Sequence, residues 1–511
     1  MVNKVRAGTV GASVRNVGWA YASFFCTKGL NLASVVILAW YLDPAEFGVM
    51  AICLAVMSYL EIISQFGMGS ALISAQEKIE ETASAVFIGG LTFSLLLLAL
   101  LWLTAAPVAA WYGDAQLADL LPIIGFALVV HALTTVNTSF LYRELKLKQK
   151  LLPDTAKGLC KGVVAITLAL LGFGVWSLVL GHLAGAVAAT LVTWWVRPWW
   201  PSKWPDLATF RYIFGFGGHL IGAQTINATP RLLDNLLVGK ILGMQALGIY
   251  SLAFRIPELG IKSFTNVVGS VLHPVMSRLQ SDRAELVAYY YGALKYSALL
   301  MFGAGAGIAV MAEPMVHLLY PPKWYPMIEI MQLIAVAFAI GTINMVPGNV
   351  FKALNRTDLM FKVSLINLPF FLILLWLAVP HGIVAVAMVQ LALAVIRFVP
   401  NYLLLRRAID ITARSTFAAL LPGAVSALSG AAAGLVILHS GLSAESALSR
   451  LLFTALAFTL AYLCVAALTA PEATSAILKR LSRRFSKSNK PPKGSPAPQS
   501  PSSNRAKAAR N

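Results

Sequence analysis

The sequence contains few charged residues. Only 12% of its 511 residues are Asp, Glu, Lys or Arg, whereas 58% are hydrophobic and the mean hydropathy is +0.74. A water-soluble chain of this length would divide into domains joined by polar linkers, and no long polar stretch occurs before the C-terminal tail. The hydrophobic core of a single water-soluble domain could not bury so much apolar surface. This composition predicts an all-α, polytopic membrane protein.

Residues that build metal, disulfide or nucleotide sites are also scarce. The four cysteines, Cys26, Cys53, Cys160 and Cys464, each lie within an apolar run, and none forms a C-x-x-C pair. The seven histidines show no H-E-x-x-H spacing, and no glycine-rich segment ends in G-K-[ST]. We therefore expect no disulfide framework, no metal, no bound cofactor, no ATP site and no catalytic residues, so the chain is not expected to be an enzyme.

Apolar segments of about 20 residues recur about fourteen times before residue 471, and each could cross a hydrocarbon core of ~30 Å as a helix. The expected spans are 17–41, 47–70, 83–110, 116–141, 156–173, 175–196, 212–239, 246–273, 290–312, 326–351, 360–380, 383–405, 415–438 and 448–470. An even number of spans puts both termini on the same side of the membrane.

Acidic residues are too few to balance the basic ones, which leaves a net charge of +19. If the N-terminus is cytoplasmic, 30 Lys and Arg residues fall on the inside, ten of them in the tail, and three fall outside: Lys240, Lys323 and Arg450. The other seven lie within spans. Because basic residues favour the cytoplasmic side, this distribution predicts cytoplasmic termini and argues against a nucleic-acid partner.

Two short motifs recur at an offset of 200 residues. Leu42–Val49 is similar to Leu242–Ile249, and Gly69–Leu72 is similar to Gly269–Leu272. The shared offset predicts duplicated halves around a central site, as in many transporters. The expected divisions are a cytoplasmic N-terminus (1–16), a six-helix lobe (17–205), a second six-helix lobe (206–405), two additional transmembrane helices (406–470) and a disordered basic cytoplasmic tail (471–511). The tail either attracts anionic lipid or only anchors the topology.

Polar residues share one face of each of the two central spans. Gln224, Asn227, Arg231 and Asp234 follow one another at steps of 3, 4 and 3 in the seventh span. In the eighth span, Arg255, Glu258, Lys262 and Asn266 are spaced by 3, 4 and 4. Further polar positions lie in the first two spans at Lys28, Asn31, Glu61 and Gln65.

Each charge near the middle of a bilayer costs ~2.5–3.5 kcal/mol, so these groups are expected to face protein, water or one another. One interpretation pairs Arg231 with Asp234 and Arg255 with Glu258, which would only hold helices together. The other places them in a hydrated central cavity. The charges within the spans are mainly cationic, so such a cavity would suit an anionic substrate.

Several of these segments carry a resemblance to a known family. Asp234–Lys240 and Leu247–Arg255 resemble the seventh and eighth helices of the polysaccharide transporter family of oligosaccharide flippases, within the multidrug/oligosaccharidyl-lipid/polysaccharide superfamily. Tyr41–Gly48 is similar to that family's first outward turn, and Phe66–Gly69 to the end of its second helix. The resemblance covers roughly residues 10–470.

The resemblance implies a two-lobed carrier in the bacterial inner membrane. It would move undecaprenyl-pyrophosphate-linked oligosaccharide between leaflets during exopolysaccharide, capsule or O-antigen synthesis, alongside membrane lipids, a polysaccharide polymerase and export machinery. The expected substrate-binding residues are Arg231, Arg255, Lys28, Lys262, Asn227 and Gln224. The expected orienting or coupling residues are Asp234, Glu258 and Glu61, and the coupling ion would be a proton or sodium.

Two other functions fit a many-helix membrane protein. A multidrug cation exporter of the same superfamily would share the architecture, but the cationic excess in the spans opposes it. A membrane-embedded polymerase or glycosyltransferase would need a large outward loop, and no outward loop here exceeds about 15 residues. The longest contains Tyr320–Tyr325, whose aromatic side chains would either touch glycan or anchor at the membrane interface.

Overall fold

The computed structural model describes residues 29–144, 146–440 and 446–472, and every element in these ranges is a helix. Ten of the described helices are long and apolar enough to cross a membrane, and a bent pair raises this number to eleven. The all-α fold is thus confirmed.

After a first helical segment, Gly29–Tyr41, the elements follow in order. They are α2 (Pro44–Gln65), α3 (Met68–Ser74), α4 (Ile79–Tyr112), α5 (Gln116–Ala132), α6 (Thr135–Arg143), α7 (Leu147–Leu170), α8 (Val175–Val196), α9 (Leu207–Ala253), α10 (Arg255–Pro257), the π-helical turn η1 (Glu258–Lys262), α11 (Ser263–Arg278), α12 (Arg283–Leu319), the 3-10 turn η2 (Pro322–Trp324), α13 (Met327–Ile343), α14 (Met345–Ala353), α15 (Thr357–Ala378), the 3-10 turn η3 (Val379–His381), α16 (Ile383–Ile396), α17 (Phe398–Ala408), α18 (Ala413–His439) and α19 (Ala447–Thr469).

Helix starts follow local sequence signals. At α2 the backbone N–H of Asp43 donates to the Glu46 carboxylate at 2.7 Å, and proline occupies the first helical position. At α9 the Asp206 carboxylate caps the helix by accepting from the side chain and backbone N–H of Thr209. These bonds, together with Lys78, lower the pKa of Asp206 to about 2.

The sharpest break in the chain lies inside α9. Gly243 has φ 86° and ψ 170°, which a glycine adopts readily, so the 47-residue element is two helices joined at a corner. This corner falls between the expected seventh and eighth spans. The eighth span is less regular than expected, because the π-helical turn η1 interrupts it between α10 and α11.

The two copies of the repeated motif pack against each other. A Cβ atom added to Gly48 would lie 1.9 Å from the backbone oxygen of Met244, and one added to Gly248 would lie 1.7 Å from that of Pro44. The two contacts are equivalent, because Gly48 corresponds to Gly248 and Pro44 to Met244 at the offset of 200 residues. Only glycine permits such a close approach of α2 and α9.

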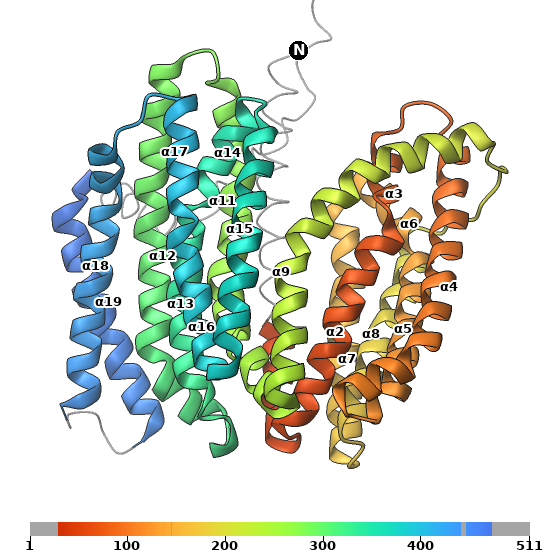
Figure 1. The fold of residues 1–511 in the computed structure, drawn as a ribbon, viewed down its shortest axis with the longest axis horizontal. Coiled ribbons are helices and arrows are strands. Elements are labelled where there is room, and N and C mark those ends of the chain that lie inside the picture. The colour runs from red at the N-terminus through yellow and green to blue at the C-terminus, as the bar shows by residue number, and fades with distance from the viewer. Residues whose placement is uncertain (1–28, 145, 441–445, 473–511) are drawn as a thin grey trace, which may run out of the picture.

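The helices form two groups in Figure 1. Helices α2 to α8 lie on one side, α11 to α17 lie on the other, and α9 runs between them. At the far edge, α18 packs against α12, where Gly423 meets the backbone of Ala298. Helix α19 packs on α18 through Phe458, which fills the space beside Gly430.

The two groups are joined at the end that carries the Asp43 turn. The indole N–H of Trp40 donates to the Leu319 carbonyl at 3.0 Å, and that of Trp324 donates to the Ala39 carbonyl at 2.9 Å. Lys323 pairs with Asp43 at 3.0 Å. We call Trp40, Asp43, Lys323 and Trp324 the Trp324 latch.

The position of Trp324 corrects one expectation. This side chain is fully buried and stands edge-on to Phe47, with ring centroids 5.1 Å apart. It is therefore a core residue between the two helix groups, unavailable in this conformation either to stack on a sugar or to anchor at the membrane interface. A loop sequence rich in aromatic residues did not reveal this burial.

Candidate functional site

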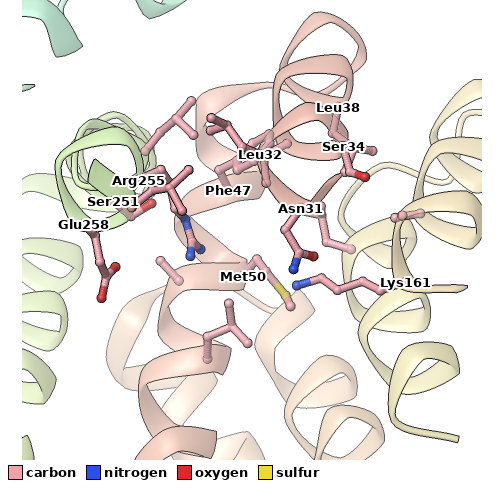
Figure 2. A pocket seen from close by; sticks show the side chains of 18 residues that line it. Asn31, Leu32, Ser34, Leu38, Phe47, Met50, Lys161, Ser251, Arg255 and Glu258 are labelled. Carbon is pink, nitrogen blue, oxygen red and sulfur yellow. The ribbon is translucent and has the colours of Figure 1, made fainter. Parts of the chain in front are cut away.

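A cavity of about 400 Å³ lies beside the latch, between the first helical segment and the stretch of chain from the end of α9 to η1. Its wall is built from Asn31 and Ser34 of the first segment and from Phe47 and Met50 of α2 (Figure 2). Residues of α7, α8, α9, α10 and η1 complete the wall. The wall is apolar except for a few polar side chains. Such a mixture is typical of a ligand site.

Two cationic side chains point into this cavity. Arg255, from α10, and Lys161, from α7, extend into the same space from opposite sides, and the amide of Asn31 lies close to the Lys161 amine (Figure 2). Among the described residues of the lining, Glu258 is the one acidic side chain, so the charge that these residues give the cavity wall is net positive.

Arg255 differs from the other charged residues nearby. No carboxylate lies within ion-pair distance of its guanidinium among the residues that the structure describes. An arginine always carries its charge and holds five N–H donors in one plane. In an apolar span this group is costly unless water or an anion meets it, so the cavity is chemically suited to an anionic ligand.

The partner of Arg231 is Glu258. Two parallel bonds join them, from Nη1 to Oε1 at 2.7 Å and from Nη2 to Oε2 at 3.1 Å. The pair links α9 to η1 across the corner at Gly243. The interpretation that paired Arg231 with Asp234 and Arg255 with Glu258 is therefore wrong. The chain folds back at the corner, and the Glu258 carboxylate accepts two parallel bonds from the Arg231 guanidinium.

Asp234 lies in a different environment. It is buried, and one carboxylate oxygen accepts hydrogen bonds from the Tyr250 hydroxyl at 3.0 Å and the Gln390 amide at 2.9 Å. The other oxygen, Oδ1, has no hydrogen-bond partner among the described residues. No cationic group lies within ion-pair distance of this carboxylate in the described part of the chain. A buried carboxylate in this state is costly unless it binds a proton or a cation.

Two of the remaining expected residues, Gln224 and Glu61, lie away from the cavity. Gln224 lines a separate pocket of about 200 Å³ with Gln65 and His131. Glu61, on α2, lies within electrostatic reach of His131 and outside the cavity lining. Lys28 lies outside the described residues, as do the side chains of Asn227 and Lys262.

Three residues of the site were missed as functional candidates. Lys161 was counted only as a charge within a span, and Gln390 and Tyr250 were not singled out. A lone polar residue in an apolar run, such as Gln390 between Ile383 and Ile396, is the signal that could have revealed this partner of Asp234. Its hydrogen bond to Asp234, 156 positions away, could not be predicted from the local sequence.

Residues 37–329 match a family described as polysaccharide biosynthesis protein, over more than half of the chain. The chain belongs to this polysaccharide biosynthesis family. It is 29% identical to the succinoglycan biosynthesis transport protein ExoT of Rhizobium meliloti (strain 1021), over 67% of this chain and 69% of the relative. It is 22% identical to the teichuronic acid biosynthesis protein TuaB of Bacillus subtilis (strain 168), over 90% and 96%.

Solved structures show the same fold. The lipid II flippase MurJ in an inward closed conformation superposes with a TM-score of 0.72 at 14% identity, over 89% of this chain and 99% of that one. A MATE family multidrug transporter in an inward-facing conformation gives 0.59 at 15% identity, over 74% and 95%. The resemblance to a flippase family drawn from the sequence is confirmed.

Proposed function

We propose that this polysaccharide biosynthesis protein is a flippase that carries polyprenyl-pyrophosphate-linked oligosaccharide across the bacterial cytoplasmic membrane. The observation that carries the proposal is the cavity beside Arg255, which offers fixed positive charge within helices that are otherwise apolar. Membership of the polysaccharide biosynthesis family and the transport role named for its relative ExoT support the same class of substrate.

The architecture that goes with this function has fourteen spans, as two six-helix lobes followed by two further helices. Three features support the count beyond the ten or eleven apolar helices: the corner at Gly243, helix α7, and the first segment at Gly29–Tyr41. The lobes are supported by matched elements, since α5 and α13 each have 17 residues and α6 and α14 each have 9.

With both termini cytoplasmic, the Asp43 turn faces the outside of the cell. The Trp324 latch then closes the outer side, and the structure corresponds to a state that cannot release substrate outward. Transport by alternating access requires the latch to open while the two lobes rock about the cavity.

Within the cavity, we assign the pyrophosphate to Arg255, with Lys161 as a second cation. Arg231 contributes through Glu258, because a ligand phosphate that displaces the like-charged Glu258 from the guanidinium would itself bind Arg231. Lys28, Lys262, Asn227 and Gln224 remain proposed contacts along the substrate path. A planar guanidinium can donate two bonds to phosphate oxygens, which is why arginine suits this role.

Asp234 is the proposed coupling residue. Its buried carboxylate has an unpartnered oxygen, so binding a proton or sodium there would relieve the cost of burial. Glu61, near His131, is a second proposed coupling group. A multidrug cation exporter would share the fold, but a net positive cavity disfavours cationic drugs.

Deleting the gene tests this function. We expect polysaccharide export to stop while lipid-linked oligosaccharide accumulates in the cytoplasmic leaflet, because synthesis continues without translocation. Re-expression of the full chain should clear the accumulated intermediate. If the deletion strain instead contained single repeat units in the outer leaflet and no polymer, the chain would be a polymerase, and the proposal would be wrong.

A further inference from the structure

A further cation lies away from the cavity, half-buried in the helix group formed by α11 to α17. Arg397 joins α16 to α17, within the apolar span Ile383–Ala408. It lines a pocket of about 250 Å³ that α9, α14, α15 and α17 also border, together with Asn344 between α13 and α14. The expected site residues do not include it.

The pocket is rich in hydrogen-bonding groups. Asn344, Asn367 and Asn401 line it together with Ser364. Asn401 donates to the Asn344 side-chain oxygen at 3.4 Å and to the backbone oxygen of Arg397 at 2.9 Å, which fixes two of the amides. The pocket is therefore ordered by its own bonds.

Two of its polar groups have no partner among the residues that the structure describes. The Nε of Arg397 and the side-chain oxygen of Asn367 are both buried without a hydrogen bond. Of the described residues, none that lines the pocket is acidic and none forms an ion pair with Arg397. Buried polar groups are nearly always satisfied in native proteins, so two unsatisfied groups in one pocket are suited to bind a ligand that would satisfy them.

We propose that this pocket binds a small singly charged anionic group, best matched by a carboxylate. A carboxylate accepts two parallel bonds from a guanidinium and neutralises the single charge of the lining. The amide of Asn367 presents a further N–H once its oxygen and nitrogen are exchanged, an ambiguity inherent to amide side chains. Pro230, beside Arg231 on α9, also lines the pocket, which places it next to the proposed substrate path.

The carboxylate has two chemical sources. It belongs either to an acidic sugar of the transported oligosaccharide or to a free small anion that serves as a permanent counter-ion. The first source rests on the proposed function, whereas the anion site itself does not. The test therefore measures binding to the purified full-length protein, without any transport.

The experiment records the thermal unfolding midpoint in detergent, with ionic strength held constant by a bulky sulfonate. Potassium glucuronate, acetate and chloride are added separately at 50 mM, and glucose serves as the neutral sugar. We expect glucuronate and acetate to raise the midpoint by about 2 °C or more, because a ligand that binds only the folded state stabilises it. Glucose should have no effect.

Arg397→Gln should abolish the rise, whereas Arg406→Gln, which removes an exposed charge from the same helix, should retain it. Asn367→Asp places a carboxylate inside the pocket. This variant should have a higher midpoint than the wild type and no response to added anions, because the site is already filled.

A larger rise with glucuronate than with acetate assigns the site to an acidic sugar, and equal rises with acetate and chloride assign it to a free anion. Two results would overturn the proposal: no rise with any anion, or the same rise in Arg397→Gln as in the wild type. Normal abundance of Asn367→Asp with an unchanged anion response would also contradict it.

Discussion

At the scale of single residues, the charged groups within the spans differ in whether a partner of opposite charge is present. Arg231 has Glu258, Asp234 has only neutral donors, and Arg255 faces a cavity. Each unpaired charge costs several kcal/mol in an apolar surrounding. Of these three residues, Asp234 and Arg255 retain this cost, and they are the ones to which we assign coupling and substrate binding, respectively.

The Arg231–Glu258 pair should contribute little to stability. About half of the Arg231 side chain is exposed, and a solvated ion pair is worth only ~0.2–1 kcal/mol. We expect Glu258→Gln to reach the membrane at near-normal abundance, measured by quantitative blotting, yet to transport less. Exchanging the charges in Arg231→Glu/Glu258→Arg should preserve abundance. Severe depletion of Glu258→Gln would indicate a purely structural pair.

Asp234→Asn separates charge from shape. The amide keeps the size of the side chain and removes a buried charge, so we expect abundance to be unchanged or higher. Transport should lose its dependence on an imposed proton or sodium gradient, measured in proteoliposomes. Asp282→Asn, which alters an exposed helix cap while preserving its capping function, is the control. Gradient-dependent transport in Asp234→Asn would exclude this carboxylate as the coupling site.

At the scale of elements, the close contact of α2 and α9 depends on two glycines of the repeated motif. A methyl group at either position would overlap a backbone oxygen, so Gly48→Ala and Gly248→Ala should each destabilise the protein by ~1–3 kcal/mol or more. Gly292→Ala meets nothing within 4 Å and should be neutral or stabilising. The stability of all three variants is compared by their thermal unfolding midpoints. An unchanged midpoint in Gly48→Ala would contradict the close contact of α2 and α9.

Much of the helical organisation could be predicted from sequence, because lipid imposes long apolar segments. The corner at Gly243 falls where the pattern ended the seventh span, and α8 matches its expected range at 175–196. The π-helical turn at Glu258 could not be predicted, since its residues fit an ordinary helix equally well. The pairing of Arg231 with Glu258 joins helices on either side of the Gly243 corner, and spacing along one helix did not reveal it.

At the scale of the whole molecule, the Trp324 latch joins the two helix groups at one end. If its opening is required for transport, cross-linking Asp43→Cys to Lys323→Cys with a short thiol reagent should stop transport. Cleaving the linker should restore transport. Each single cysteine variant, in a background without the native cysteines, is the control. Full transport by the cross-linked protein would show that this end does not move.

The central claim is that Arg255, in the cavity between the two helix groups, binds the transported substrate. Substitutions of this residue test it directly. In a strain that lacks its own flippase, externally accessible lipid-linked oligosaccharide is measured for the full chain and for variants of matched abundance. We expect Arg255→Lys to reduce translocation about tenfold, because a lost charge-assisted hydrogen bond costs ~1.5–3 kcal/mol, and Arg255→Ala to reduce it further. Arg278→Ala, at an exposed position, should translocate normally. Normal translocation by Arg255→Ala would contradict the assignment of this cavity to the substrate.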